Sequence, residues 1–336
     1  MPRSSIACAL SMCAFGSALS ACGAAPPSVS VPFTAQTNLV QRVSDAQRVS
    51  RRAGPGDAVT SWMSPSVTAQ ALLYVLDNTY VTVYSYPQGK LEGRLRHFYL
   101  ADDACVDTKG DVFIVNLGYG RVFEYAHGGT KRLEDLDIPG AAGCSIDAAS
   151  GNLAVAGGNA QGGVHIFKHA HGTPTTYTDS AFYKYYFCGY DDKGNLFVDG
   201  QSYPGASGDF LLAELPKRGS ALKTIAVNQT IGWPGEVQWD GKYLAIQDQS
   251  FGTVIYQFAI SGSQATKVGT TNLGGAGGVH QTWIQGGTLI APNTCLNSCD
   301  YSDALFYKYP AGGSAIKKIK KSVRGPLGVV VSLAAK

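Results

Sequence analysis

The chain has 336 residues, of which 45% are hydrophobic and 15% are charged, a composition too apolar for an intrinsically disordered protein. The net charge of +3 is small and spread out, which argues against a nucleic-acid-binding surface. The 41 glycines, with frequent Tyr and Val, favour many short strands joined by turns. Since all-β folds of roughly 200–250 residues commonly form one unit, we expect a single folded domain.

The first elements in chain order are targeting signals. Arg3 precedes a short apolar stretch at 6–18, which is too short to span a bilayer and is typical of a secretory signal peptide. The following Leu-Ser-Ala-Cys sequence, ending at Cys22, resembles the bacterial lipobox, in which the cysteine is acylated after cleavage. We therefore expect a signal peptide at 1–21 and a lipid-anchored Cys22, with ordinary cleavage nearby as the alternative. Gly23 in place of aspartate implies, by the same resemblance, the outer membrane of a diderm bacterium.

The next segment, residues 22–60, is rich in Ala, Pro, Ser and Arg and shows no periodicity. Such a composition predicts a flexible tether between the lipid anchor and a folded part. The folded part is expected at 61–336. Within it, residues 62–71 are predicted to be an irregular lead-in, and regular strand patterns begin at Leu72.

Two turn patterns then recur along the folded part. In the first, an aromatic or apolar residue leads into a glycine turn, and its six copies begin at Tyr84, Tyr125, Phe167, Leu215, Phe258 and Tyr307. The copies lie roughly 40–50 residues apart, as in four-stranded propeller blades. The second pattern is an Asp-containing turn, which begins at Asp107, Asp147, Asp191 and Asp240. In this turn aspartate accepts backbone N–H bonds and glycine supplies positive φ. We predict an all-β, six-bladed β-propeller with four-stranded antiparallel blades.

The two ends of the folded part are predicted to pair with each other. The first regular strand, Leu72–Asp77, matches the second strand of each repeat. The last, Pro326–Leu333, matches the innermost strand. The C-terminal strand is therefore expected to complete the first blade, which removes an exposed sheet edge.

Several of these segments are similar to known propeller repeats. Residues 73–78 are similar to the YVTN signature strand, and residues 105–115 and 189–198 are similar to NHL strand pairs. From about Leu72 to Leu333 the chain thus resembles bacterial NHL- and YVTN-type β-propellers. It also resembles secreted bacterial lipoproteins that share Tyr-Pro-x-Gly-Gly turns and a Trp-Asp-Gly-Lys segment. The resemblance implies a fold and a cell-envelope location, and no particular activity.

Five cysteines remain after signal cleavage and lipidation. Because export implies an oxidising compartment, Cys295 and Cys299 are expected to form a small loop disulfide. A metal half-site is disfavoured there because no second ligand pair is present. Cys105, Cys144 and Cys188 lie in strand patterns and are expected to be buried thiols. A bridge between Cys144 and Cys188, at matching positions of adjacent repeats, is the alternative.

Aromatic residues occupy loops that should share one face of a propeller. They are Tyr80, Tyr99, Tyr119, Tyr183, Tyr185, Tyr203, Trp233, Phe251 and Tyr301. Strand periodicity does not explain aromatics in loops. Tyr and Trp supply large contact areas at low entropic cost, as protein or carbohydrate recognition requires. The alternative is that several of them fold inward between the blades.

A second candidate site lies at the upper mouth of the central channel. Alignment of the innermost strands places Asp103, Glu236 and Gln281 at equivalent positions, with His280 adjacent. Converging oxygens there are suited to Ca²⁺ or another divalent ion. Gluconolactonase-like propellers, which the arrangement resembles, bind a channel metal through Glu, Asn and Asp. That ligand set is not matched in this chain, so solvated polar residues around a pore are the alternative.

The sequence thus favours a binding or scaffold module for a protein, a glycan or another ligand at the aromatic face. We expect a monomer that contacts the membrane through its lipid anchor and binds no nucleic acid and no obligatory cofactor. The alternative is a metal-assisted hydrolase or lyase, in which Asp103, Glu236 and His280 act at the channel.

Overall fold

The computed structural model describes residues 60–157, 162–203, 208–250, 253–294 and 302–334. Residue contacts divide the chain into two units, Met1–Pro32 and Phe33–Lys336, and every described residue lies in the second. The signal peptide, Cys22, the tether up to residue 59, and Cys295 with Cys299 lie outside the described residues, so those expectations stay predictions. In the described ranges, no helix is long and apolar enough to cross a membrane.

The described part of the chain is all-β, apart from two single-turn 3₁₀ helices, η1 (Val67–Ala69) and η2 (Lys168–Ala170). One sheet has the order β1 (Trp62–Met63), β4 (Leu91–Arg96), β3 (Tyr80–Ser85), β2 (Leu72–Leu76) and β25 (Gly328–Ser332). Two four-stranded sheets follow. They are β5 (Ala101–Val106), β6 (Val112–Asn116), β7 (Arg121–Tyr125), β8 (Arg132–Asp137), and β9 (Ala141–Ile146), β10 (Leu153–Gly157), β11 (Gly163–Phe167), β12 (Thr175–Tyr177).

The later strands form three further antiparallel sets. The first contains β13 (Lys184–Tyr190), β14 (Leu196–Gln201), β15 (Phe210–Leu215) and β16 (Lys223–Val227). The second contains β17 (Val237–Trp239), β18 (Leu244–Asp248), β19 (Val254–Ser261) and β20 (Gln264–Gly274). The third contains β21 (Trp283–Gln285), β22 (Thr288–Thr294), β23 (Ser302–Lys308) and β24 (Gly312–Ile319).

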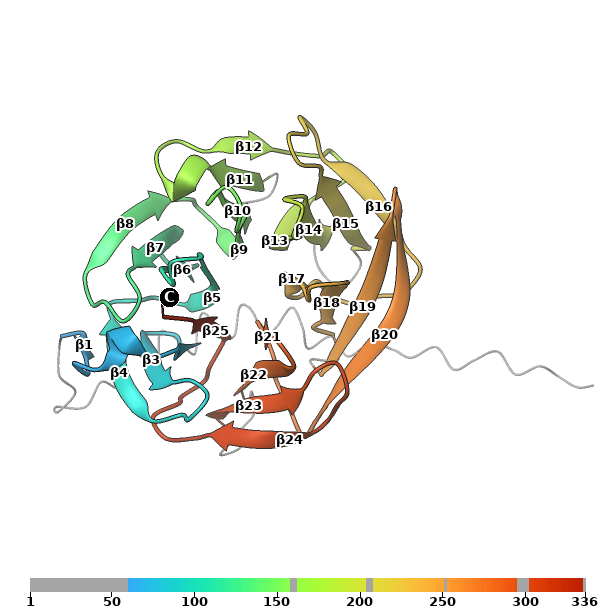
Figure 1. The fold of residues 1–336 in the computed structure, drawn as a ribbon. Helices are drawn as coiled ribbons and strands as arrows, with labels where there is room; N and C mark the ends of the chain where they lie inside the picture. The colour runs from blue at the N-terminus through green and yellow to red at the C-terminus, as the bar shows by residue number, and fades with distance from the viewer. Residues whose placement is uncertain (1–59, 158–161, 204–207, 251–252, 295–301, 335–336) are drawn as a thin grey trace, which may run out of the picture. The chain divides into compact units, whose positions relative to one another are not determined.

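The outer strands of these three sets are not separate from one another. The eleven-residue β20 pairs in parallel with β16 at one end and with β24 at the other, so the three sets form one continuous sheet. This differs from the predicted set of separate four-stranded sheets. The reason is the length of β20, which reaches from one neighbouring outer strand to the other. In Figure 1 the first strands β5, β9, β13, β17 and β21, together with β25, lie nearest the middle.

Hydrophobic cores lie between successive sets of strands. Leu72 and Tyr74 of β2 pack with Ile114 of β6 in one core, and Phe187 of β13 packs with Phe258 of β19 in another. The strands therefore bury residues on both faces, which explains their near-continuous apolar sequences. Leu73 and Val75 of β2 pack with Ile290 and Phe306, from the last set of strands.

The C-terminal strand β25 pairs antiparallel with β2 over its whole length, from Leu72 opposite Ser332 to Leu76 opposite Gly328. Ser332 also links this strand to the next sheet. Its hydroxyl lies 2.5 Å from Nδ1 of His127 and donates to the backbone oxygen of Gly110 at 2.6 Å. Hydrogen bonds thus join β25 to β2 on one side and to the sheet of Gly110 and His127 on the other.

The Asp-containing turns form as the sequence predicts. The Oδ1 atom of Asp191 accepts the backbone N–H groups of Lys193 and Asn195, and Gly194 has a φ of 84°. Asp107 makes the same two bonds around Gly110. The lead-in differs from its prediction, because Trp62 and Met63 form β1 and add a fifth strand beside β4.

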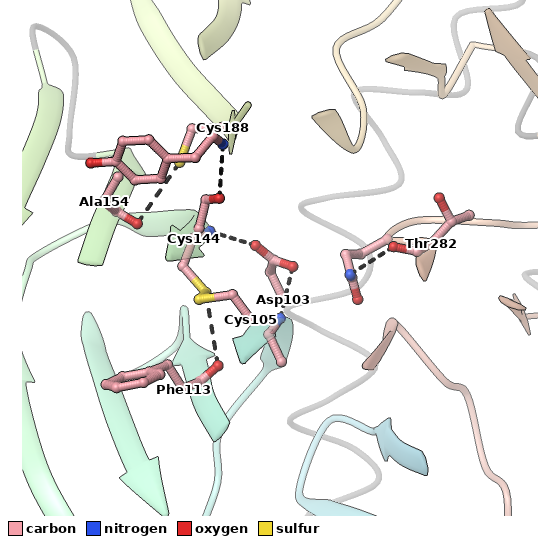
Figure 2. The surroundings of a disulfide bond; sticks show 11 residues. Asp103, Cys105, Phe113, Cys144, Ala154, Cys188 and Thr282 are labelled. Atoms are coloured by element: carbon pink, nitrogen blue, oxygen red, sulfur yellow. Dashed lines mark hydrogen bonds between the residues drawn. A yellow bond between two sulfur atoms is a disulfide. The ribbon is translucent and has the colours of Figure 1, made fainter. Parts of the chain in front are cut away.

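A disulfide joins Cys105 of β5 to Cys144 of β9, across two neighbouring sheets (Figure 2). The prediction of three buried thiols is therefore wrong for two of them, and the alternative Cys144–Cys188 bridge is wrong as well. Cys188 is the free, buried cysteine of the described residues, and its Sγ lies 3.8 Å from the backbone oxygen of Ala154. The sequence signal was ambiguous because all three cysteines lie on innermost strands, at positions that point to neighbouring sheets.

Replacing both Cys105 and Cys144 with alanine is expected to lower the free energy of unfolding by about 3–4 kcal/mol, because the bridge closes a loop with a sequence separation of 39. Reversible urea denaturation measures the loss, and a reducing agent should cause the same shift in the wild-type protein. Cys188→Ala is the matched control, since it removes a buried thiol and no crosslink. Equal midpoints for wild-type protein with and without the reducing agent contradict the prediction.

Candidate functional site

Aromatic rings form three pairs at one end of the sheets, five of them on loops and one, Tyr186, on β13. Because successive strands are antiparallel, the loops that enter each first strand share this end with the loops that join second and third strands. The ring centroids lie 5.8 Å apart in Tyr99–Tyr119, 6.4 Å apart in Tyr183–Tyr203, and 5.9 Å apart in Tyr186–Trp233. These separations are in the favourable range for aromatic pairs. We call the six residues the aromatic face.

The aromatic face leaves part of its ring surface in solvent. Tyr119 is 54% exposed and Tyr203 is 63% exposed, although each is paired with a second ring that is half-buried. An exposed ring that is already ordered by a neighbour loses little conformational freedom when it contacts a ligand. The arrangement is therefore suited to recognition.

The remaining predicted aromatics are placed differently. Tyr80 is half-buried at the start of β3, with the guanidinium of Arg94 4.2 Å from its ring and a side-chain hydrogen bond to Asp77. Tyr185 is buried, stacks on Phe182 at 4.7 Å and binds the backbone of Asp179, so its prediction as a face residue is wrong. Tyr185 is buried because its position on β13 directs its side chain into the core. Phe251 and Tyr301 lie outside the described residues.

Buried polar residues at the ends of second strands hold the loops of the aromatic face. The Oδ1 atom of Asn116, at the end of β6, accepts the backbone N–H of Tyr99 at 3.2 Å. Asp248, at the end of β18, accepts the N–H groups of Gly232 and Trp233 at 3.2 and 3.3 Å. The sequence analysis missed this role. A polar residue at the end of an otherwise apolar strand could have indicated this role, because a buried polar side chain needs a hydrogen-bond partner.

The channel residues predicted from strand alignment come together. Asp103 and Glu236 interact electrostatically, and Glu236 hydrogen-bonds to Gln281. Asp103 also accepts the N–H of Cys144 in the next sheet at 2.6 Å (Figure 2). Gln281 accepts the N–H of Val329 at 2.7 Å. These side chains therefore join neighbouring innermost strands to each other.

Asp199 completes this group and was missed by the sequence analysis. It lies on β14, where its two carboxyl oxygens accept the N–H of Phe187 at 2.8 Å and of Gly235 at 3.1 Å. Its signal was a charged residue inside the apolar run of residues 196–200. Like Asp103, it connects one set of strands to the next, so its role is structural first.

Burial raises the pKa of all three carboxyl groups. The pKa of Asp103 is raised to about 8 by desolvation, with a smaller contribution from the neighbouring Asp102. Desolvation also raises the pKa of Glu236 and of Asp199 well above their ordinary values. The negative charges of Asp103 and Asp199 raise the pKa of Glu236 further. The Oε2 atom of Glu236 has no hydrogen-bond partner among the described residues.

Two side chains hold the ring of His280 by hydrogen bonds. Its Nε2 lies 3.0 Å from Oδ2 of Asp102, its Nδ1 lies 3.0 Å from Oε1 of Gln249, and its ring packs against Phe187 at 5.5 Å. Both ring nitrogens of His280 thus have side-chain partners, and the ring is fixed in place. The carboxylate that it contacts is Asp102, a residue that the sequence analysis did not single out.

The channel oxygens are also a poor match for Ca²⁺, which takes six to eight oxygen ligands. Both carboxyl oxygens of Asp103 already accept backbone N–H groups, from Ala104 and Cys144. Over the ranges that the structure describes, three or more His, Cys, Asp or Glu side chains nowhere converge in a geometry that could hold a metal ion.

No protein-family model matches the sequence, and no curated protein matches it. Solved structures do match the fold. A chain of a nidogen/laminin complex aligns with a TM-score of 0.59 at 11% identity, over 79% of this chain and 100% of that one. A protein of unknown function from Bacteroides caccae aligns with a TM-score of 0.57 at 11% identity, over 79% and 99%. At this identity the likeness concerns the fold alone. Together with the multi-sheet all-β architecture, this likeness is consistent with a β-propeller.

Proposed function

We propose that this protein is a binding module whose aromatic face engages a protein or a glycan. The observation that carries the proposal is the set of three ring pairs at one end of the sheets, with Tyr119 and Tyr203 largely exposed. Loops braced by Asn116 and Asp248 fix the backbone beneath Tyr99 and Trp233. A surface ordered in this way resembles the aromatic centres of binding sites.

The scaffold we propose is a six-bladed propeller closed by β25. The support for this count is that buried cores join each set of strands to the next, while β25 pairs with β2 and a further core joins β2 to β22 and β23. We propose further that the module is monomeric and that a lipid on Cys22 anchors it in the cell envelope. The lipobox-like sequence supports this anchor.

Replacing Tyr119, Tyr203 and Trp233 together with alanine is expected to weaken ligand capture by at least about 30-fold, because the loss of even one aromatic anchor at the centre of a binding site costs about 2 kcal/mol. The measurement is recovery of bound protein and glycan from envelope extract by immobilised wild-type and variant domains. Ile316→Ala on β24 is the control, since Ile316 is 57% exposed and lies outside the aromatic face. Identical capture by wild-type and triple-variant domains would mean that the face binds nothing.

The metal-assisted hydrolase or lyase is not proposed as a second function. Of its residues, Asp103 and His280 are held by hydrogen bonds to the backbone and to other side chains, and Glu236 has one such bond, to Gln281. No observed contact favours it over the binding module.

A further inference from the structure

Exposed cations gather where the last set of strands meets the first. They lie on β24 and on the segment that leads from β24 to β25, and we call them the basic surface: Lys318, Lys320, Lys321 and Arg324. Within the described ranges 60–103 and 302–334, by contrast, every Asp and Glu side chain is buried, namely Asp77, Glu92, Asp102, Asp103 and Asp303. The net charge of the whole chain is small, but the solvent-facing charge of this part is of one sign.

Hydrogen bonds fix the basic surface against the first sheet. The hydroxyl of Tyr84, on β3, donates to the backbone oxygen of Lys321 at 2.6 Å. Lys317 of β24 reaches the turn between β3 and β4, where its Nζ donates to the backbone oxygen of Gln88 at 2.7 Å and to that of Pro87. Cations from the last set of strands therefore lie beside the first set.

Arg94 of β4 extends the basic surface on the first sheet. Its guanidinium lies 4.2 Å from the ring centroid of Tyr80. Burial and the charge of Asp77 raise the pKa of Tyr80 to about 12, and the positive charges of Arg94 and Arg324 oppose that rise. Both guanidinium groups therefore lie near one ring, although they belong to different sets of strands.

An exposed indole accompanies these cations. Trp62 is 40% exposed and pairs opposite Arg94 where β1 adds to β4, so the two side chains lie on the same face of that sheet. Cations next to an exposed Trp are typical of surfaces that lie at a bilayer–water interface. There the indole occupies the headgroup level, and Lys and Arg contact anionic lipids.

The chain also enters the described domain beside the basic surface. The description begins at residue 60, and the hydroxyl of Ser61 accepts the backbone N–H of Arg96, on β4, at 3.0 Å. Cys22 precedes this point in the chain. The lipid proposed for Cys22 would thus be joined to the domain through the sheet that carries Arg94 and Trp62.

We propose that the basic surface, with Arg94 and Trp62, docks the domain on an anionic lipid membrane. The cations contact headgroup phosphates, and the Trp62 indole lies at the headgroup level. The choice of a membrane over another polyanion rests in part on the lipid anchor proposed above. Docking does not use the aromatic face, whose exposed rings, Tyr119 and Tyr203, lie on other sets of strands.

Co-sedimentation with vesicles tests the proposal. The protein is the chain that remains after the expected cleavage, residues 22–336, with Cys22→Ala so that it carries no lipid. Binding is expected to vesicles of mixed phosphatidylglycerol and phosphatidylcholine, and little binding to phosphatidylcholine alone. The binding should weaken steeply as salt is added, because salt screens exposed charges.

Replacing the four residues of the basic surface with glutamine should weaken this binding by at least about 100-fold, because each cation near an anionic bilayer contributes roughly fivefold. The matched control removes three exposed lysines and one exposed arginine from another set of strands, and should keep most of the affinity. It replaces Lys193, Lys217, Arg218 and Lys223 with glutamine. Thermal unfolding of both variants checks that they are folded.

Trp62→Ala distinguishes a membrane from a soluble polyanion. It should weaken vesicle binding by roughly fivefold and leave retention on a heparin column unchanged, because only a bilayer offers the indole an interface. Leu133→Ala is the control and should change neither measurement, since Leu133 is 49% exposed on β8.

Absence of binding to the anionic vesicles overturns the proposal, and so does binding that the quadruple glutamine variant or Trp62→Ala leaves unchanged. Retention on heparin without vesicle binding assigns the basic surface to an acidic polymer and overturns the proposal as well. Acylation of Cys22 is measured separately, by the mass of the wild-type protein extracted from cell envelopes. Failure of the basic surface is therefore distinguishable from failure of the lipid anchor.

Discussion

Deletion of residues 326–336 is expected to abolish soluble folding. The deleted segment contains β25, whose Val329, Val330 and Val331 are buried in two different cores. Burial of each such side chain contributes about 1.5–3 kcal/mol, so their joint loss is comparable with the whole stability of a typical domain. The deletion would also expose the edge of β2, a strand buried along its length, and exposed apolar edges promote aggregation.

The experiment compares soluble yield, size-exclusion profile and thermal unfolding of two truncations. Deletion of residues 333–336 is the control, because it leaves β25 complete up to Ser332 and should fold. Val330→Asp in the full chain is a second probe, which buries a charge at the same position without shortening the strand. A monomeric 1–325 chain with a cooperative thermal transition would show that β25 is dispensable.

Glu236→Gln is expected to stabilise the protein at neutral and alkaline pH. Burial raises the pKa of Glu236 in the folded state well above the 4.5 of an ordinary glutamate. Above that ordinary value the unfolded chain therefore releases a proton that the folded chain retains. The folded state binds more protons, so the free energy of unfolding falls as pH rises, by at most about 1.4 kcal/mol per pH unit for one group. The amide of the Glu236→Gln variant does not titrate, so the variant should lose stability less steeply.

The same linkage applies to Asp103, whose pKa changes from 3.8 to about 8, and to Asp77, whose pKa changes to about 7. The wild-type protein should therefore lose stability between about pH 4 and pH 8 through these carboxyls. Urea denaturation at intervals over that range measures the slope. Asp209→Asn, which removes an exposed carboxyl, is the control and should keep the wild-type slope. A Glu236→Gln slope equal to that of wild type contradicts a buried, proton-retaining Glu236.

Local chemistry made some parts of the fold predictable. The Asp191 turn depends on one carboxylate, the nearby backbone N–H groups and a glycine of positive φ, all within four residues. Such a unit is favoured by its local sequence, because its contacts are short-range. The alignment of innermost strands was predictable for a related reason. It used the repeat spacing, and it correctly brought Asp103, Glu236 and Gln281 together.

Other parts depended on partners that are distant in the sequence. The bond between Cys105 and Cys144 required the relative positions of β5 and β9, which three similar cysteines left open. The pairing of His280 with Asp102 spans 178 positions. Tyr185 lies on β13, where it pairs opposite Gly200 of β14, whereas Tyr183 lies just before that strand; the strand boundary, which depends on pairing with β14, separated a core residue from a face residue.

The sequence by itself determined that this is an all-β chain of repeated strands joined by Asp and Gly turns, because those features follow from strand propensity and local hydrogen bonds. It also indicated which loops carry aromatic rings. Only the tertiary structure decided that the rings pair, that Asn116 and Asp248 hold their loops, and that Arg94 and Arg324 lie near one ring. The physical reason is that ring pairing, bracing and the gathering of charges depend on contacts between strands of different repeats. Their energies depend on positions that no local pattern specifies.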